Sequence, residues 1–123
     1  MKIRIRGNTI RFRLTKPEVE TFCSTGFLEA KIDFYPEPFS YSIQTDESLW
    51  ELKAVFLNGR LTLLVPAAWI KDWVISNRTG FESSMVTGQG VHIDLLLEKD
   101  FKCLDQTVGD QSDQYENPLN VKS

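Results

Sequence analysis

Two segments of this chain, residues 1–35 and 52–86, carry the same order of local signals, and this repetition constrains the fold more than any other feature. Each segment begins with a strand, a two-residue turn and a second strand. A proline then opens a short helix, and Thr-Gly-Phe leads into another strand. The paired strands are predicted at residues 2–6, 9–14, 52–57 and 60–65. A duplicated ββαββ unit indicates two halves that bury their apolar faces against each other.

The chain of 123 residues is long enough for one domain with a buried core. Its net charge of −3 is unevenly distributed. The first 17 residues contain no acid and six basic side chains, which are Lys2, Arg4, Arg6, Arg11, Arg13 and Lys16. Residues 105–123 have four acids and one base, so they supply the whole net charge. We expect one barrel domain at residues 1–104, with repeats at 1–45 and 50–98, and an acidic polar tail at 105–123.

The first hairpin has one apolar and one basic face. A two-residue Gly7-Asn8 turn pairs Arg6 with Thr9, which sets Arg4 opposite Arg11 and Lys2 opposite Arg13. Like charges directly opposed on paired strands are unfavourable by roughly 0.2–1 kcal/mol per pair. Either nearby acids such as Glu29, Asp33 or the tail compensate these charges, or the face binds phosphate groups, for which arginine supplies bidentate donors.

The second hairpin turns at Asn58-Gly59, a strong hairpin signal, and pairs Phe56 with Leu61, Ala54 with Leu63 and Leu52 with Val65. Its outward face is largely apolar, with Val55, Leu57 and Leu64. If exposed, such a patch needs a partner. Two further hairpins are predicted at residues 27–45 and 81–98. Helices are expected at 17–22, with Thr15 as N-cap, and at 66–73. The predicted core is Ile3, Ile5, Ile10, Phe12, Val19, Phe22, Phe56, Leu61, Leu63, Ile70 and Trp73.

Targeting, metal and catalytic signals are missing from the sequence. We expect no signal peptide, because the first residues contain no continuous apolar run, and no apolar run approaches the length of a membrane span. Cys23 and Cys103 match neither metal-ligand spacing nor a disulfide framework. His92 has no second His or Cys for a catalytic or ligand role, so an exposed strand position is expected. We therefore expect a cytoplasmic protein that is not an enzyme, with no cofactor, no metal site and no membrane contact.

The segment Gly7-Asn8-Thr9, followed by Phe12-Arg13-Leu14, resembles the first hairpin of the swapped-hairpin AbrB superfamily, in particular its MazE-type antitoxins. Thr9 replaces the family's Ser, and Thr15 replaces its Pro. The second copy, residues 58–66, resembles the same pattern and keeps the proline. The whole chain also resembles a group of small bacterial proteins of unknown activity that end in Asp-x-Ser-Asp-x-Tyr-x-Asn-Pro.

The AbrB resemblance implies a fold and a function. In that superfamily two ββαββ chains exchange hairpins to form a dimeric barrel, so a tandem duplication implies a pseudo-twofold barrel in one chain, α+β and mostly β, with two short helices. Family members bind DNA through arginines of the first hairpin. Carried over by position, these are Arg6, Asn8, Arg11 and Arg13, whereas the second copy offers only Lys53 and Arg60.

Three functions follow, in order of preference. The first is a nucleic-acid-binding regulator of AbrB/MazE type, whose acidic tail binds a protein or competes for the basic face. The second is a protein-interaction module that has lost DNA binding and uses the tail or Val55, Leu57 and Leu64. The third is a binder of a small phosphate ligand. The residues expected to contact nucleic acid are Lys2, Arg4, Arg6, Asn8, Arg11 and Arg13.

Overall fold

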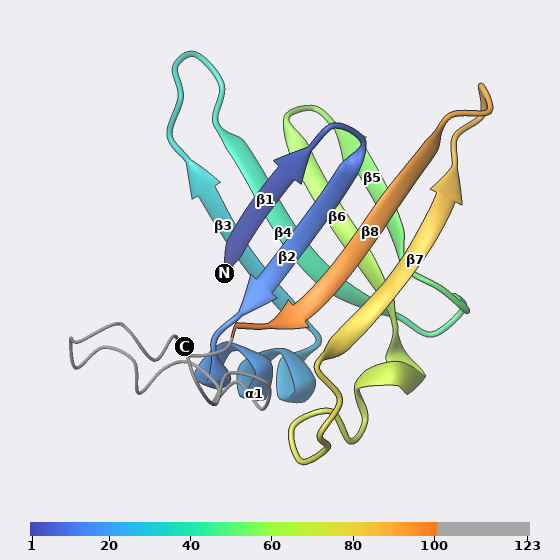
Figure 1. Cartoon of the computed structure of the whole chain (residues 1–123). Coiled ribbons are helices and arrows are strands. Elements are labelled where there is room, and N and C mark those ends of the chain that lie inside the picture. The colour runs from blue at the N-terminus through green and yellow to red at the C-terminus, as the bar shows by residue number, and fades with distance from the viewer. Residues whose placement is uncertain (101–123) are drawn as a thin grey trace, which may run out of the picture.

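The computed structural model describes residues 1–100, which form two four-stranded β-sheets and one α-helix (Figure 1). The strands are β1 (Lys2–Arg6), β2 (Thr9–Leu14), β3 (Phe27–Ile32), β4 (Phe39–Asp46), β5 (Lys53–Leu57), β6 (Arg60–Pro66), β7 (Gly80–Val86) and β8 (His92–Lys99). The helices are α1 (Lys16–Thr25) and the 3₁₀ helix η1 (Ala67–Ile70). The α+β class, mostly β, is as expected. Cys103 and the acidic tail lie outside the described residues.

Each sheet combines one hairpin from each repeat. Sheet A has the order β1-β2-β8-β7, and sheet B has the order β3-β4-β6-β5. Within each hairpin the strands are antiparallel, whereas the two hairpins of a sheet meet through a parallel pair, β2 with β8 and β4 with β6. The counterparts in the two repeats are β1 and β5, β2 and β6, β3 and β7, and β4 and β8. Replacing each strand of sheet A by its counterpart gives the strand order of sheet B, read in reverse. The two repeats therefore share each sheet and cannot be separated into independent halves.

The two sheets do not close into the predicted barrel. Where the edge strands β5 and β7 approach each other, the N–H groups of Leu52 and Ala54 donate to side-chain atoms of β7. The acceptors are Ser83 Oγ at 3.0 Å and Met85 Sδ at 3.4 Å. A closed barrel requires a ladder of backbone hydrogen bonds at every seam. The expectation of a barrel was therefore wrong, because side chains occupy the seam where a ladder would form.

The hairpin registers follow the turn arithmetic. In the first hairpin Arg6 pairs with Thr9, Arg4 with Arg11 and Lys2 with Arg13, as predicted. In the second hairpin the predicted Phe56–Leu61 and Ala54–Leu63 pairs are present. The ladder begins at Lys53, so the third predicted pair, Leu52 with Val65, lies beyond its end.

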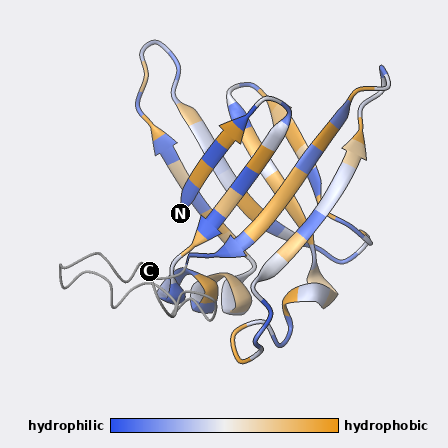
Figure 2. Cartoon of the chain, in the orientation of Figure 1, coloured by the Kyte–Doolittle hydropathy of each residue, from blue (hydrophilic) through white to orange (hydrophobic). Residues whose placement is uncertain are grey.

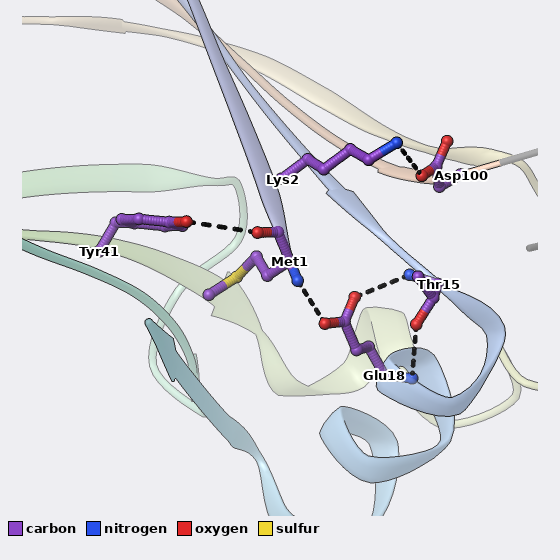
Figure 3. Close-up of polar contacts among 6 residues, drawn as sticks. All are labelled: Met1, Lys2, Thr15, Glu18, Tyr41 and Asp100. Atoms are coloured by element: carbon purple, nitrogen blue, oxygen red, sulfur yellow. Dashed lines mark hydrogen bonds and ion pairs between the residues drawn. The ribbon is translucent and has the colours of Figure 1, made fainter. Parts of the chain in front are cut away.

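Helix α1 is well capped at both ends. The Thr15 hydroxyl accepts from the Glu18 N–H, and Glu18 Oε1 accepts from the Thr15 N–H at 2.8 Å, which forms a capping box. The other Glu18 oxygen pairs with the amino group of Met1, and Tyr41 donates its hydroxyl proton to the Met1 carbonyl (Figure 3). Gly26 ends the helix at φ +79°, in the left-handed region that glycine tolerates.

The second predicted helix is much shorter than expected. Residues 67–70 form one 3₁₀ turn, and Pro66 contributes no side-chain cap to it. The ring of Trp69 stacks on Phe81 at 5.2 Å, and Trp73 lies 5.1 Å from the same ring and donates Nε1–H to the Arg78 carbonyl. Aromatic packing, rather than a regular helix, holds this segment against sheet A.

The core contains inward-facing residues of both sheets. Figure 2 shows apolar and polar residues alternating along the strands. Seven of the eleven predicted core residues are buried: Phe12, Val19, Phe22, Leu61, Leu63, Ile70 and Trp73. Ile3 and Ile10 are partly buried against this core. Ile5 and Phe56 are 59% and 65% exposed, so their prediction was wrong. Both precede hairpin turns at the end of the sheets opposite α1, where no helix covers them (Figure 1).

Candidate nucleic-acid interface

The outward face of sheet A carries the predicted basic residues on β1 and β2. The parallel register places Thr9 beside Asp94, Arg11 beside Leu96 and Arg13 beside Glu98. Because side chains alternate along a strand, these residues share one face of the sheet. Strand β8 therefore brings acids from the second repeat next to the cations of the first.

These acids neutralise the half of the face nearest α1. Glu98 Oε1 lies 3.5 Å from Nε of both Arg11 and Arg13. Lys2 Nζ lies 3.0 Å from Oδ2 of Asp100 (Figure 3), whose carboxylate is largely buried. Compensation by acids was one of the two interpretations of the face, and it holds for three of its cations.

The compensating acids are not the ones that the sequence suggested. Glu29 Oε2 pairs with Arg60 at 3.2 Å, and Asp33 Oδ1 pairs with Lys31 at 3.5 Å. Both acids thus serve bases of the outward face and edge of sheet B. The prediction that Glu29 or Asp33 neutralises the basic hairpin was wrong, because the hairpin pairs with β8 rather than with β3.

The other half of the basic face, toward the Gly7-Asn8 turn, remains cationic. Arg4 and Arg6 are exposed and form no ion pair within residues 1–100. With Thr9 and Arg11 they line a depression of about 280 Å³ that has no acid in its wall. The Arg11 Nε atom is enclosed, and its 3.5 Å contact with Glu98 is an ion pair without hydrogen-bond geometry. The two guanidinium groups of Arg4 and Arg6, which form no ion pair among the described residues, and the Thr9 hydroxyl suit the recognition of phosphate oxygens.

Asn8 has a structural task at the turn. Its side-chain amide donates to the His92 carbonyl at 3.2 Å, and its own carbonyl accepts from the Asp94 N–H at 2.9 Å. These two bonds fasten the first hairpin to the start of β8. His92 is exposed at the first position of β8, as the sequence indicated.

Sheet B has an equivalent face with different chemistry. Counting outward from each turn, Leu57 takes the place of Arg6, Val55 that of Arg4 and Leu64 that of Arg13. Val55 and Leu57 are exposed, and Leu64 is partly exposed. The duplication has therefore placed apolar side chains in the second hairpin at three positions that carry arginine in the first.

Lys99 is a residue to which the sequence analysis assigned no role. Its side chain is buried, and Nζ donates to the Ser76 carbonyl at 2.9 Å and lies 5.7 Å from the Trp73 ring centroid. Burial lowers the pKa of Lys99, and burial raises the pKa of the nearby Cys23 thiol. A lysine at the end of a strand pattern carries no signal of burial, so only the packing of residues 73–78 against β8 identifies it.

Other kinds of site find no support within the described part of the chain. Among residues 1–100, no three His, Cys, Asp or Glu side chains are grouped so that they can hold a metal ion. None of the helices described here is long and apolar enough to cross a membrane.

The chain was also compared with known proteins. Residues 1–119 match the model of a family described as "Family of unknown function (DUF7009)". Searches of curated proteins and of solved structures gave no match.

Proposed function

The chain belongs to the family of unknown function DUF7009, and from its own residues we propose that it binds nucleic acid through the cationic half of the outward face of sheet A. The observation that carries this proposal is the depression lined by Arg4, Arg6, Thr9 and Arg11, in which Arg4 and Arg6 form no ion pair within the described residues. Electrostatic contacts with phosphates supply most of the affinity of such interfaces. A face this small suits a few neighbouring phosphates. Because the net charge of the chain is −3, we expect the rest of its surface not to attract a polyanion.

The arrangement of the two repeats supports an AbrB/MazE-like interpretation of this interface. Each sheet exchanges hairpins between repeats, and their strand orders interchange as an approximate twofold axis requires. In the resembling family the first hairpin meets DNA, and here that hairpin contains Arg4, Arg6 and Arg11. Because Val55 and Leu57 replace two of these arginines in the second repeat, we infer that one hairpin of each chain contacts the nucleic acid.

Replacing Arg4 and Arg6 together with alanine should weaken binding to duplex DNA and reduce its salt dependence. The slope of log affinity against log salt has a magnitude of about 0.9 per phosphate neutralised on duplex DNA, so losing two contacts should lower it by about 1.8. Fluorescence anisotropy with a labelled duplex, titrated at several salt concentrations, measures both quantities.

The matched control is Lys16→Ala with Lys71→Ala, which removes the same charge from exposed positions outside the depression. If both double variants lose the same affinity, binding reflects net charge and not this site. If the intact chain binds neither duplex DNA nor single strands at low salt, the proposal fails. Arg11 and Arg13 are poorer first targets, because their removal leaves Glu98 without its two cations.

Deleting residues 105–123 should strengthen binding to the same duplex. Asp100 pairs with Lys2 and donates its N–H to the Leu14 carbonyl at 2.8 Å, so the chain leaves the described structure beside the basic face. The deleted segment carries four acids against one base, and the prediction holds if these acids compete with phosphates for the basic face. A control in which the four acids become Asn or Gln should have the same effect. An unchanged or weaker affinity would exclude competition by the tail.

A protein-interaction role is the second candidate function. It rests on the exposure of Val55 and Leu57 on the face of sheet B that matches the basic face. Loss of DNA binding by the intact and the truncated chain alike would favour this role.

A further inference from the structure

Strand β5 ends in three consecutive apolar residues that are all accessible to solvent. Val55 is 40% exposed, and Phe56 and Leu57 are each 65% exposed. Val55 and Leu57 lie on the outward face of sheet B, and Phe56 lies on its inward face. Strand β5 is also an edge strand, so these apolar side chains lie beside backbone polar groups that no strand of sheet B pairs. Exposed apolar edge strands readily pair with another strand.

The uncovered backbone groups of β5 are those of Phe56. In a hairpin with a two-residue turn, Leu57, Val55 and Lys53 exchange backbone bonds with β6, so Leu52, Ala54 and Phe56 point away from it. Leu52 and Ala54 use their N–H groups on Ser83 and Met85 of β7. The next position along β7 would face Phe56, but β7 has ended at Val86. The Phe56 N–H and C=O therefore lie at an uncovered part of the edge.

Strand β1, the counterpart of β5 in the first repeat, has a different edge. Its outward positions carry Arg4 and Arg6 where β5 carries Val55 and Leu57. Charged side chains on an edge strand oppose pairing with a second edge. The two edges thus occupy matching places in the fold and share one lysine at their far ends, Lys2 and Lys53, but near the turn only β1 carries charges.

We propose that β5 pairs with β5 of a second copy of this chain, antiparallel and about a twofold axis at Phe56. The two Phe56 residues then face each other and exchange both backbone hydrogen bonds. Val55 of each copy lies opposite Leu57 of the other, which forms two apolar cross-strand pairs on the outward face. Lys53 falls opposite Gly59, so no like charges meet.

Antiparallel pairing of β1 with β1 of a second copy, about the matching twofold axis, gives the opposite electrostatic result. It would place Arg4 of each copy opposite Arg6 of the other, and like charges directly opposed destabilise paired strands. Self-pairing is therefore favourable at β5 and unfavourable at β1. The resulting dimer joins two B sheets into one eight-stranded sheet and leaves the basic face of each copy on its own sheet A. The inference does not depend on nucleic-acid binding.

The first test measures the mass of the full chain without nucleic acid. Sedimentation velocity over a series of concentrations should show a monomer that converts to a dimer. Val55→Arg with Leu57→Arg, which gives β5 the charge pattern of β1, should remain monomeric throughout the series. The control is Ile75→Arg, at a residue that is 83% exposed outside both sheets, and it should dimerise as the native chain does. Far-UV circular dichroism checks that each variant is folded.

The second test separates backbone pairing from apolar contact. Phe56→Pro removes the outward N–H without removing a bond to β6, as proline on an edge strand allows. It should abolish the dimer, whereas Phe56→Ala, which keeps the N–H, should only weaken it. In the native chain, exchange of the Phe56 amide hydrogen should slow as concentration rises. Three results overturn the proposal: a native chain that stays monomeric, a double variant with Val55→Arg and Leu57→Arg that dimerises normally, or a Phe56 amide whose exchange does not depend on concentration.

Discussion

Replacing Phe12 with alanine is expected to lower the free energy of unfolding by about 3–5 kcal/mol, the range for truncating a core aromatic residue. The Phe12 side chain is completely buried. It lies opposite Ile3 of β1 and beside Leu97 of β8, at the parallel junction between the two repeats. The cavity left behind is bounded by strands on both sides, so neighbouring side chains cannot readily fill it.

Urea unfolding followed by tryptophan fluorescence measures this loss of stability. Phe34→Ala is the matched control, because that ring is 60% exposed and the same atoms are removed. The control should change the free energy of unfolding by no more than about 0.5 kcal/mol, as is usual for surface substitutions. A loss well under about 1 kcal/mol for Phe12→Ala would mean that the two faces of β2 have been assigned the wrong way round.

Replacing Gly80 with alanine is expected to destabilise the protein by about 1–3 kcal/mol or more, as overpacking at a site without room does. A Cβ atom at Gly80 would lie 2.2 Å from the Leu97 carbonyl oxygen and 2.9 Å from the Glu98 Cα. Both are backbone atoms of β8, so no side-chain rotation relieves the overlap. The strands β7 and β8 must move apart at the Gly80–Glu98 pair, which also displaces the acid that serves Arg11 and Arg13.

The control for this substitution is Gly88→Ala in the β7–β8 turn, where nothing lies within 4 Å of an added Cβ. Thermal unfolding of both variants separates a steric effect at Gly80 from a general cost of alanine. Equal melting temperatures for the two variants would show that β8 accommodates the methyl group without strain.

The local structure could be read from the sequence because its causes are local. The Gly7-Asn8 and Asn58-Gly59 turns set the hairpin registers, since a two-residue turn leaves one way to pair the flanking strands. Thr15 and Glu18 indicated the start of α1 in the same way. The identical Thr-Gly-Phe tripeptides show the limit of such reading. Gly26 ends a helix at positive φ, whereas Gly80 is the first residue of β7 and lies close to the backbone of β8.

The candidate site was only half predictable. Alternation along β1 and β2 placed the cations on one face, and the structure has them there. The structure also revealed that Glu98 and Asp100 form ion pairs with three of these cations. Arg4 and Arg6 are left unpaired within the described residues. Residues 98 and 100 are more than 80 positions away from the basic hairpin in the chain, so no local pattern links them to it.

What the sequence by itself determined is the duplicated unit, the turns, the hairpin registers and the sign of charge on each strand face. Only the tertiary structure decided which hairpins share a sheet, that the seams stay open, and where acids meet arginines. The physical reason is the range of the interactions involved. Turn geometry and strand alternation act between neighbouring residues and leave a periodic signal in the sequence. The parallel β2–β8 and β4–β6 pairs join segments whose contact exists only once both repeats have folded around one core.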